Sequence, residues 1–317
     1  MNDLGQLSLL AIYGAMAAYG IAMVAFGIDL SALRDGGPAD RPRKAVRVAM
    51  TTTWAGLALH ATGVVTRGIA AGRVPWANMY EFSIVFTFVA VTTFLLVQRW
   101  RDLRYLGALV VTPVLLALGL AVSVLYIEAD GVRPALDHYW LVIHVSVATA
   151  AIGVFSVGAA ISVVQLVKAR GEATRAVVER KPAVALAGGS GTVAADTAPA
   201  ERDRGFWGRL SDVLPGSAEL ERLAYRLNAV GFLLWTFTLI AGAIWAEHAW
   251  GRPWNWDPKE VGTFVVWVVY AAYLHARATR GWDGRKAAYL GLSGFGLLLV
   301  NYYVVNLFAD TVHGYAF

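Results

Sequence analysis

Long apolar runs alternate with short polar segments along most of the chain. Each run is long enough to cross the roughly 30 Å hydrocarbon core of a bilayer as a helix. The pattern predicts eight transmembrane helices, at about residues 4–28, 47–68, 80–97, 105–127, 139–167, 227–246, 260–277 and 287–309. The expected fold class is therefore all-α, in a polytopic membrane protein.

One polar segment, residues 169–226, is much longer than the others and divides the chain. Residues 1–168 would carry the first five helices, and residues 227–317 the last three. Residues 184–200 are rich in Ala, Gly and Thr, and we predict that the segment is a largely disordered cytoplasmic linker. Near residues 217–227, leucines recur at helical spacing among charged residues. This spacing predicts an amphipathic helix on the inner membrane surface that leads into the sixth span.

Composition agrees with this class. The chain has 317 residues, of which 57% are hydrophobic and 15% are charged. It contains no cysteine, which excludes structural disulfides, thiolate metal ligands and a thiol-exchange role for this chain. The net charge of +5 does not require a nucleic-acid partner, because it follows from where the basic residues lie.

Lysine and arginine are concentrated in alternate loops. Of the 27 basic residues, 22 lie in the loops at 29–47, 98–104, 168–226 and 277–286. Cytoplasmic loops carry an excess of Lys and Arg. We therefore expect these loops in the cytoplasm, and both termini on the extracytoplasmic side together with the loop at residues 245–260.

That last loop, WAEHAWGRPWNWDPKE, is the most distinctive stretch of the chain. Its four tryptophans are Trp245, Trp250, Trp254 and Trp256. At its end we predict a helix start, with Asp257 as the N-cap, Pro258 in the first position and Glu260 completing a capping box. The tryptophans could form an interfacial aromatic belt or a platform for a large flat ligand, and the pattern alone leaves both open.

The loop resembles the tryptophan-rich "WWD" signature of the haem-handling proteins of cytochrome c maturation, and most closely the CcsA (ResC) type. Three further segments are similar to segments of this family and occur in the expected order. They are GRVPWANMYEF (72–82), WLVIHV (140–145) and NLFADTVHGYAF (306–317). Together the similarities cover most of the chain outside residues 170–215.

The resemblance implies a membrane subunit of a cytochrome c synthase, that is, part of a haem lyase complex in the bacterial cell membrane. Such a subunit moves haem b to the outer face and holds it reduced between two histidines. It then presents the haem for thioether attachment to apocytochrome c at a Cys-x-x-Cys-His segment. The implied partners are a CcsB (ResB) type membrane subunit, apocytochrome c and a thiol-reducing, thioredoxin-like protein. A haem transporter or chaperone without ligation activity is the main alternative, and a scaffold with only an aromatic belt is another.

The resemblance also assigns histidines to the haem iron. His144 and His313 match the external pair of ligands, and the predicted topology places both at the level of the tryptophan loop. His275 matches an inner, membrane-embedded ligand whose second histidine usually comes from the partner subunit. His60 is a less favoured partner for His275, because we expect it nearer the middle of the membrane. His248 departs from the family motif, and we treat it as a bystander.

Other residues are expected around the haem edge. Our hypothesis is that the loop tryptophans Trp250, Trp254 and Trp256 position the ring while Asp257 holds the loop. Arg252 or Lys259 would meet the propionates through charge-assisted hydrogen bonds.

Glu81 has two interpretations. The resemblance makes it a second wall of the ligand site. The alternative is an interface carboxylate paired with Arg67 or Arg73.

Overall fold

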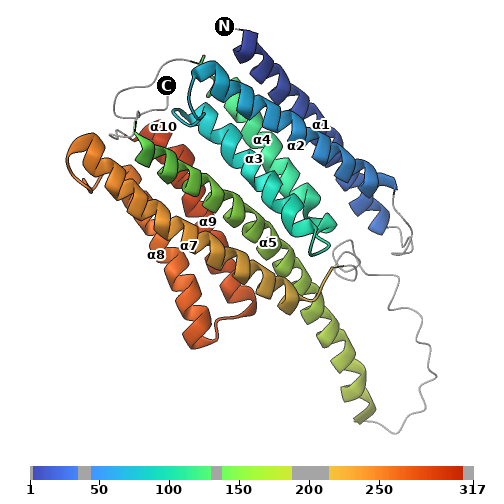
Figure 1. Ribbon diagram of the computed structural model, residues 1–317. Helices are drawn as coiled ribbons and strands as arrows, with labels where there is room; N and C mark the ends of the chain where they lie inside the picture. The colour runs from blue at the N-terminus through green and yellow to red at the C-terminus, as the bar shows by residue number, and fades with distance from the viewer. Residues whose placement is uncertain (1–2, 35–43, 130–137, 188–213, 310–317) are drawn as a thin grey trace.

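The computed structural model is a bundle of long helices and describes residues 3–34, 44–129, 138–187 and 214–309 (Figure 1). Within these residues, eight helices are long enough and apolar enough to cross a membrane. The fold class and the number of spans predicted from the hydrophobic pattern are confirmed.

The elements follow one another along the chain as a simple succession of helices. They are α1 (Asp3–Arg34), α2 (Lys44–Ala71), α3 (Met79–Gln98), the short η1 (Arg104–Leu106), α4 (Gly107–Ser123), α5 (Tyr139–Ala187), α7 (Ser217–Trp250), α8 (Pro258–Arg280), α9 (Gly284–Leu299), the π-helical η3 (Val300–Val305) and α10 (Asn306–Phe308).

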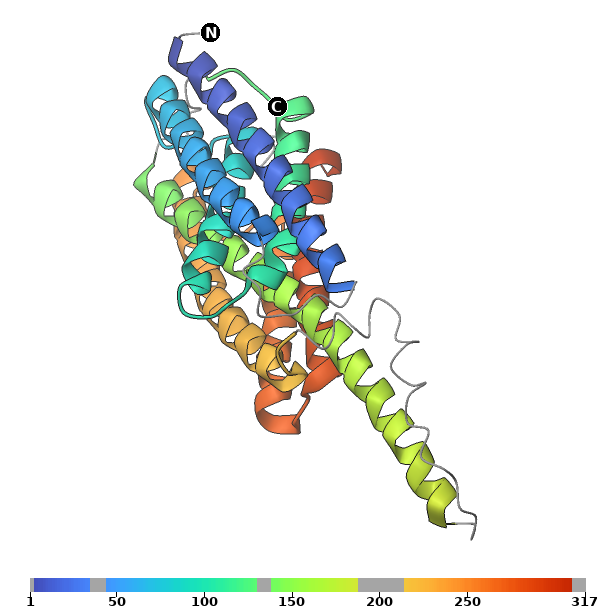
Figure 2. The same ribbon diagram turned by 90° about the vertical axis from the view of Figure 1, so that its right-hand side faces the viewer.

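The bundle has two sides that meet along α3 and α5. On one side α1 packs along α2 and also contacts α4; on the other, α5 packs along α7 and α8 packs against α9. The start of α5, the turn between α7 and α8, and α10 lie at the same end of the bundle, and α5 extends well beyond the opposite end (Figures 1 and 2).

Small residues allow the two sides to approach closely. A Cβ added to Gly153 of α5 would lie 2.5 Å from the Val89 side chain and 3.1 Å from the Ala90 backbone nitrogen of α3. Burial of apolar surface does not drive helices together inside a bilayer, so close van der Waals packing at small residues matters more. Gly153 therefore sets the distance between α3 and α5.

Two helices extend well beyond their predicted bounds. α5 continues to Ala187, about twenty residues past the predicted end of the fifth span and into the segment expected to be a disordered linker, so that part of the prediction is wrong. The expected amphipathic helix near 217–227 and the sixth span form one continuous helix, α7, which no proline interrupts between Ser217 and Trp250. α7 ends only at Gly251, which adopts a left-handed conformation (φ +70°) that glycine tolerates without strain. Trp245 and Trp250 consequently lie on a helix and not in the loop.

The predicted start of α8 is confirmed. Asp257 is the N-cap, Pro258 occupies the first turn, and the Glu260 side chain completes a capping box. Glu260 Oε2 also accepts a hydrogen bond from the Asn255 backbone at 2.7 Å. One carboxylate thus fixes both the first turn of α8 and the end of the tryptophan loop.

Candidate functional site

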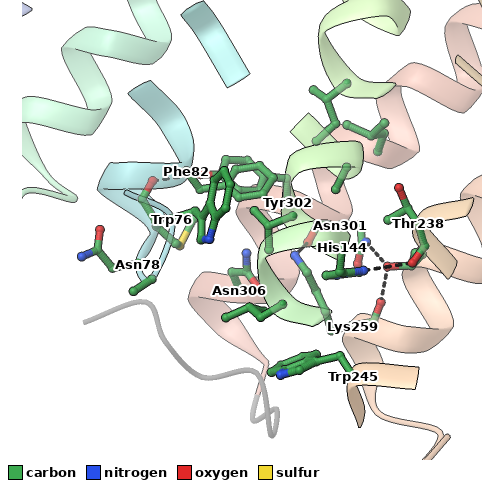
Figure 3. Close-up of a pocket in the computed structure, with 18 of the residues that line it drawn as sticks. Trp76, Asn78, Phe82, His144, Thr238, Trp245, Lys259, Asn301, Tyr302 and Asn306 are labelled. Atoms are coloured by element: carbon green, nitrogen blue, oxygen red, sulfur yellow. Dashed lines mark hydrogen bonds between the residues drawn. The ribbon is translucent and has the colours of Figure 1, made fainter. Parts of the chain in front are cut away.

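A cavity of about 150 Å³ lies between the helices at the end of the bundle where α5 begins. Its walls come from the α2–α3 connection and from α3, α5, α7, α8, the end of α9, η3 and α10 (Figure 3). The lining is mainly apolar and aromatic, with a few polar groups. The residues that define its character are Trp76, Phe82, His144, Trp245, Lys259 and Tyr302.

The orientation of His144 is set by α7. Its Nδ1 lies 2.9 Å from the backbone carbonyl oxygen of Thr238, which can only accept a hydrogen bond. Nδ1 must then carry the proton, so the lone pair of a neutral ring resides on Nε2. Metal-binding histidines are held in this way by a carbonyl or carboxylate on the other ring nitrogen.

Two further contacts hold the same imidazole. The Trp245 ring is stacked against it, with centroids 6.1 Å apart and planes inclined by 18°. A Cβ added to Gly242 would lie 2.8 Å from His144 Cε1, so only glycine leaves room for the ring at this place. Thr238 and Gly242 are one helical turn apart on α7, and sequence reasoning missed both.

Lys259 enters the cavity near His144 (Figure 3). Its ammonium group donates to the carbonyl oxygen of Asn301 at 3.1 Å and lies 5.6 Å from the centroid of the Tyr302 ring. Within the described part of the chain, the ammonium makes no ion pair with a carboxylate. Lys259 is therefore a cation at the cavity whose hydrogen-bond partner here is neutral.

The acceptor for Lys259 comes from an irregular stretch of helix. Asn301 lies in the π-helical η3, a type of turn that often occurs at functional sites. Its side-chain amide donates to Thr263 at 3.1 Å. Its side-chain oxygen is buried and has no hydrogen-bond partner among the described residues, so this cavity wall retains an unused acceptor.

The opposite wall is built by the segment before α3 and by the first turn of α3. Trp76 and Phe82 face the cavity, and the Asn78 side chain caps α3 by accepting from the Glu81 backbone at 2.9 Å. The hydroxyl of Tyr302 donates to the Met79 carbonyl oxygen at 3.0 Å. These bonds fasten the aromatic wall to both α3 and η3.

Glu81 lies behind this wall and is fully buried. Its carboxylate accepts hydrogen bonds from Arg67 at 2.9 Å and Arg73 at 2.6 Å. It also accepts from the backbone of Ala77 at 2.9 Å. The structure thus places Glu81 in an ion-pair network that supports the Trp76 segment, which is the arrangement expected of the interface carboxylate.

The loop tryptophans separate into two groups. Trp250 packs edge-on against Trp245, with ring centroids 4.8 Å apart. The rings of Trp254 and Trp256 pack edge to face, with centroids 5.8 Å apart, beside the start of α8. Among the described residues that line the cavity, the indoles are those of Trp76, Trp235 and Trp245. Trp250 and the pair at 254 and 256 lie outside that lining.

Trp256 has an unusual conformation. Its side chain is 76% exposed. Its φ is +59°, and among the described residues it is the one non-glycine residue with a positive φ. Bulky residues avoid this region, and such strain tends to collect at functional sites. Asp257, the next residue, is buried and holds the loop at the N-terminus of α8.

The remaining predicted residues lie in different places. His313 lies outside the described residues. His275 is exposed on α8, and Arg252 is exposed in the tryptophan loop. His60 is buried between Tyr19 of α1 and Phe88 of α3, on the side of the bundle away from α8. His60 thus packs among α1, α2 and α3, whereas α8 contacts α7, α9 and η3.

His248 is on the last turn of α7, where its Nδ1 bonds the Ile244 carbonyl oxygen at 2.8 Å. Its ring lies 4.7 Å from that of His138, measured between centroids. The contact is at the surface and joins the end of α7 to the start of α5.

A family model described as cytochrome C assembly protein matches residues 76–313 of this chain. A protein of Synechococcus elongatus described as cytochrome c biogenesis protein CcsA is 36% identical over 272 residues, which cover 78% of this chain and 81% of the relative. The chain belongs to the cytochrome c assembly family. It is a multi-pass membrane protein of cytochrome c biogenesis in bacteria.

Other members and one solved structure agree. The relative from Rippkaea orientalis, also described as CcsA, is 34% identical over 288 residues, covering 80% of this chain and 84% of the relative. The structure of the cytochrome c haem lyase CcmF matches with a TM-score of 0.64 and 15% identity, over 100% of this chain and 49% of that chain. This second likeness shows that the fold is shared.

Proposed function

We propose that this chain is the haem-handling membrane subunit of a cytochrome c synthase, with haem b as its substrate. The cavity at the start of α5 would receive the haem and present it to apocytochrome c. The observation that carries the proposal is the His144 imidazole, whose Nδ1 is held by the Thr238 carbonyl oxygen at 2.9 Å. A neutral imidazole oriented in this way is a common axial ligand of haem iron.

The chemistry of the cavity fits such a ligand. Aromatic side chains suit a flat apolar macrocycle, and the few polar groups suit its carboxylate edge. Lys259 would donate a charge-assisted hydrogen bond to a haem propionate, and the Asn301 amide lies beside it. Arg252, the other candidate, is exposed, so Lys259 is the better choice.

His313 remains the proposed second axial ligand. Asn306 of α10 lines the cavity, and His313 follows it by seven residues. A chain of this length can span up to roughly 25 Å, which is ample to reach the far face of a ring bound to His144. Ligation by two imidazoles would keep the iron low-spin and closed to oxygen until apocytochrome c supplies its own histidine.

Haem supplies the vinyl groups, and each thioether forms when a cysteine S–H adds across one of them. The protein residues orient the reactants. Trp250, Trp254 and Trp256 would lie beside the presented edge, with Asp257 and Glu260 holding their loop. The exposed His275 on α8 suits an inner site completed by a CcsB (ResB) type partner, and a thioredoxin-like protein would keep the apocytochrome thiols reduced.

Absorption spectra of the purified protein test the ligand assignment. His144→Gly and His313→Gly should each abolish the low-spin bis-histidine signal, and added imidazole should restore it. Gly242→Ala keeps the imidazole but crowds it, so we expect a weakened signal that imidazole does not restore. An unchanged spectrum in the His144→Gly, His313→Gly double variant would refute the assignment.

A haem transporter without ligation activity would have the same spectra. Incubating the purified complex with reduced haem and a Cys-x-x-Cys-His peptide separates the two functions. The synthase should form a covalent haem–peptide product, detectable by mass spectrometry after acid extraction of free haem. A complex that binds haem and releases it without this product would be a transporter or chaperone.

A further inference from the structure

A second cavity, of about 440 Å³, lies at the end of the bundle opposite His144. It forms where the connection from α3 to α4 meets the first turns of α7. The residues that define it are Arg101, Tyr105, Leu220, Arg222, Leu223 and Arg226. They combine guanidinium groups with apolar side chains, and the proposed function uses none of them.

The α3–α4 connection is a rigid wall of this cavity. The Gln98 side-chain oxygen accepts from the Leu103 backbone at 2.6 Å, and the Leu103 side chain is buried. Arg104 Nε donates to Asp102 at 2.8 Å. Hydrogen bonds from the Arg104 side chain lower the pKa of Asp102 to about 2. The Asp102 carboxylate is thus already neutralised by a cation on its own loop.

A second ion pair, between Arg101 and Glu219, lies on the other side of this cavity. Arg101 lies 2.9 Å from Glu219 across the cavity, and this contact ties the α3–α4 connection to the start of α7. The two carboxylates at the cavity, Asp102 and Glu219, are therefore each engaged with an arginine. The positive charge that remains belongs to Arg222 and Arg226.

Arg222 and Arg226 lie on one face of α7, one turn apart. Both are exposed, and neither makes an ion pair or a hydrogen bond within the residues that the structure describes. Like charges at this spacing repel and destabilise a helix. An anion held between the two guanidinium groups would remove that repulsion, and a phosphate offers the oxygen geometry that arginine binds best.

The position of the cavity specifies the source of the phosphate. Span α3 ends at Gln98 and the next span begins at Arg104, so the α3–α4 connection lies at a membrane boundary. Leu220, Leu223 and Tyr105 give the cavity an apolar side next to its arginines. The distribution of Lys and Arg predicts that this end faces the cytoplasm, where anionic lipids attract basic groups.

We propose that this cavity binds the phosphodiester headgroup of an anionic phospholipid, with Arg222 and Arg226 as the phosphate ligands. Tyr105 and Leu223, which are partly exposed, contact the glycerol and the first carbons of the acyl chains. Inorganic phosphate shares the recognised chemistry but lacks the apolar part. Binding at this cavity is independent of the haem site, so either assignment can fail without the other.

Native mass spectrometry of the detergent-purified protein, offered equal amounts of phosphatidylglycerol and phosphatidylcholine, tests the proposal. The wild-type chain should retain phosphatidylglycerol in preference. Arg222→Gln and Arg226→Gln should each reduce this retention about fivefold, because each basic group near the surface contributes roughly that factor. Arg47→Gln, which removes an exposed basic residue of α2 away from the cavity, is the matched control and should change retention less than twofold.

Glu219→Gln is expected to increase retention of phosphatidylglycerol, which a misfolded protein would not do. Glu219→Gln removes a carboxylate and releases Arg101, so retention of phosphatidylglycerol should rise above that of the wild type. Inorganic phosphate at millimolar concentration should fail to displace the lipid. Equal losses in Arg47→Gln and the cavity variants would indicate diffuse surface attraction, and displacement by inorganic phosphate would indicate a free-phosphate site; either result overturns the proposal.

Discussion

Two charged groups lie at the same end of the bundle and have opposite surroundings. Glu81 is fully buried and accepts hydrogen bonds from Arg67, Arg73 and the Ala77 backbone. Lys259 reaches the cavity and donates to a single neutral carbonyl, that of Asn301. The two groups are connected through Tyr302, which lies beside Lys259 and bonds the Met79 carbonyl oxygen of α3.

The difference separates a structural charge from one available to a ligand. A buried carboxylate with two guanidinium partners is already neutralised, and its loss would leave those partners uncompensated. A cation whose partner is neutral can still gain from a charged ligand, because charge-assisted hydrogen bonds are about twice as strong as neutral ones. Glu81 should therefore control stability, and Lys259 should control binding.

The largest effect is expected for Glu81→Ala. The substitution leaves the buried guanidinium of Arg67 without its counter-ion, and breaking a buried pair in this way costs about 3–5 kcal/mol. Thermal unfolding of the purified protein can be monitored by size-exclusion chromatography of heated samples. The midpoint temperature of unfolding should be much lower for Glu81→Ala than for the wild type. Trp76 should also become more accessible to quenchers, because its segment loses the support of the carboxylate.

Glu81→Gln is the matched control. The amide oxygen can still accept from one arginine, so the loss of stability should be clearly smaller than for Glu81→Ala. If both variants melted like the wild type but lost haem, Glu81 would belong to the ligand site itself, and the contrast with Lys259 would fail.

Lys259→Met should have a smaller effect than Glu81→Ala. It should change the affinity for haem and leave the stability of the fold nearly unchanged. The methionine keeps most of the apolar stem, while the variant loses a hydrogen bond to a charged group worth about 1.5–3 kcal/mol. Haem affinity, measured by titration of the apoprotein, should fall about ten- to a hundredfold. The melting temperature of the apoprotein should change little.

Haem dimethyl ester sharpens this test. Its propionates are blocked and carry no charge, so the wild type and Lys259→Met should bind it with similar affinity. A Lys259→Met defect of equal size for haem and for its dimethyl ester would show that the ammonium does not meet a propionate.

The sequence was most informative where local chemistry decides the structure. Eight apolar runs gave eight spans, and the Asp257, Pro258 and Glu260 spacing gave the observed capping box. Both depend on nearest neighbours along the chain and on the length needed to cross a bilayer. Periodicity and capping rules are therefore sufficient for them.

The composition of the cavity could not be read in the same way. Thr238 and Gly242 matter because α7 presents a carbonyl and a gap to a ring on α5, and only helix packing reveals that relation. Trp250 was expected in a loop, yet it lies on a helix because α7 continues to Gly251. The π-helical stretch that contains Asn301 gives no local signal in the sequence.

The smallest effect is expected for Trp256, which extends the same contrast to the loop. Trp256 is 76% exposed with φ +59°, a conformation that glycine adopts more easily than any bulky residue. In Trp256→Gly, the relief of strain roughly offsets the greater entropy of the unfolded chain and the lost contact with Trp254. Stability should change by no more than about 1 kcal/mol. Thioether formation on the Cys-x-x-Cys-His peptide should nevertheless slow. The Trp256 indole is held exposed in a strained conformation without stabilising the fold, which is expected of a side chain that contacts the reactants. If Trp256→Gly instead melted early and ligated normally, Trp256 would be structural, like Glu81.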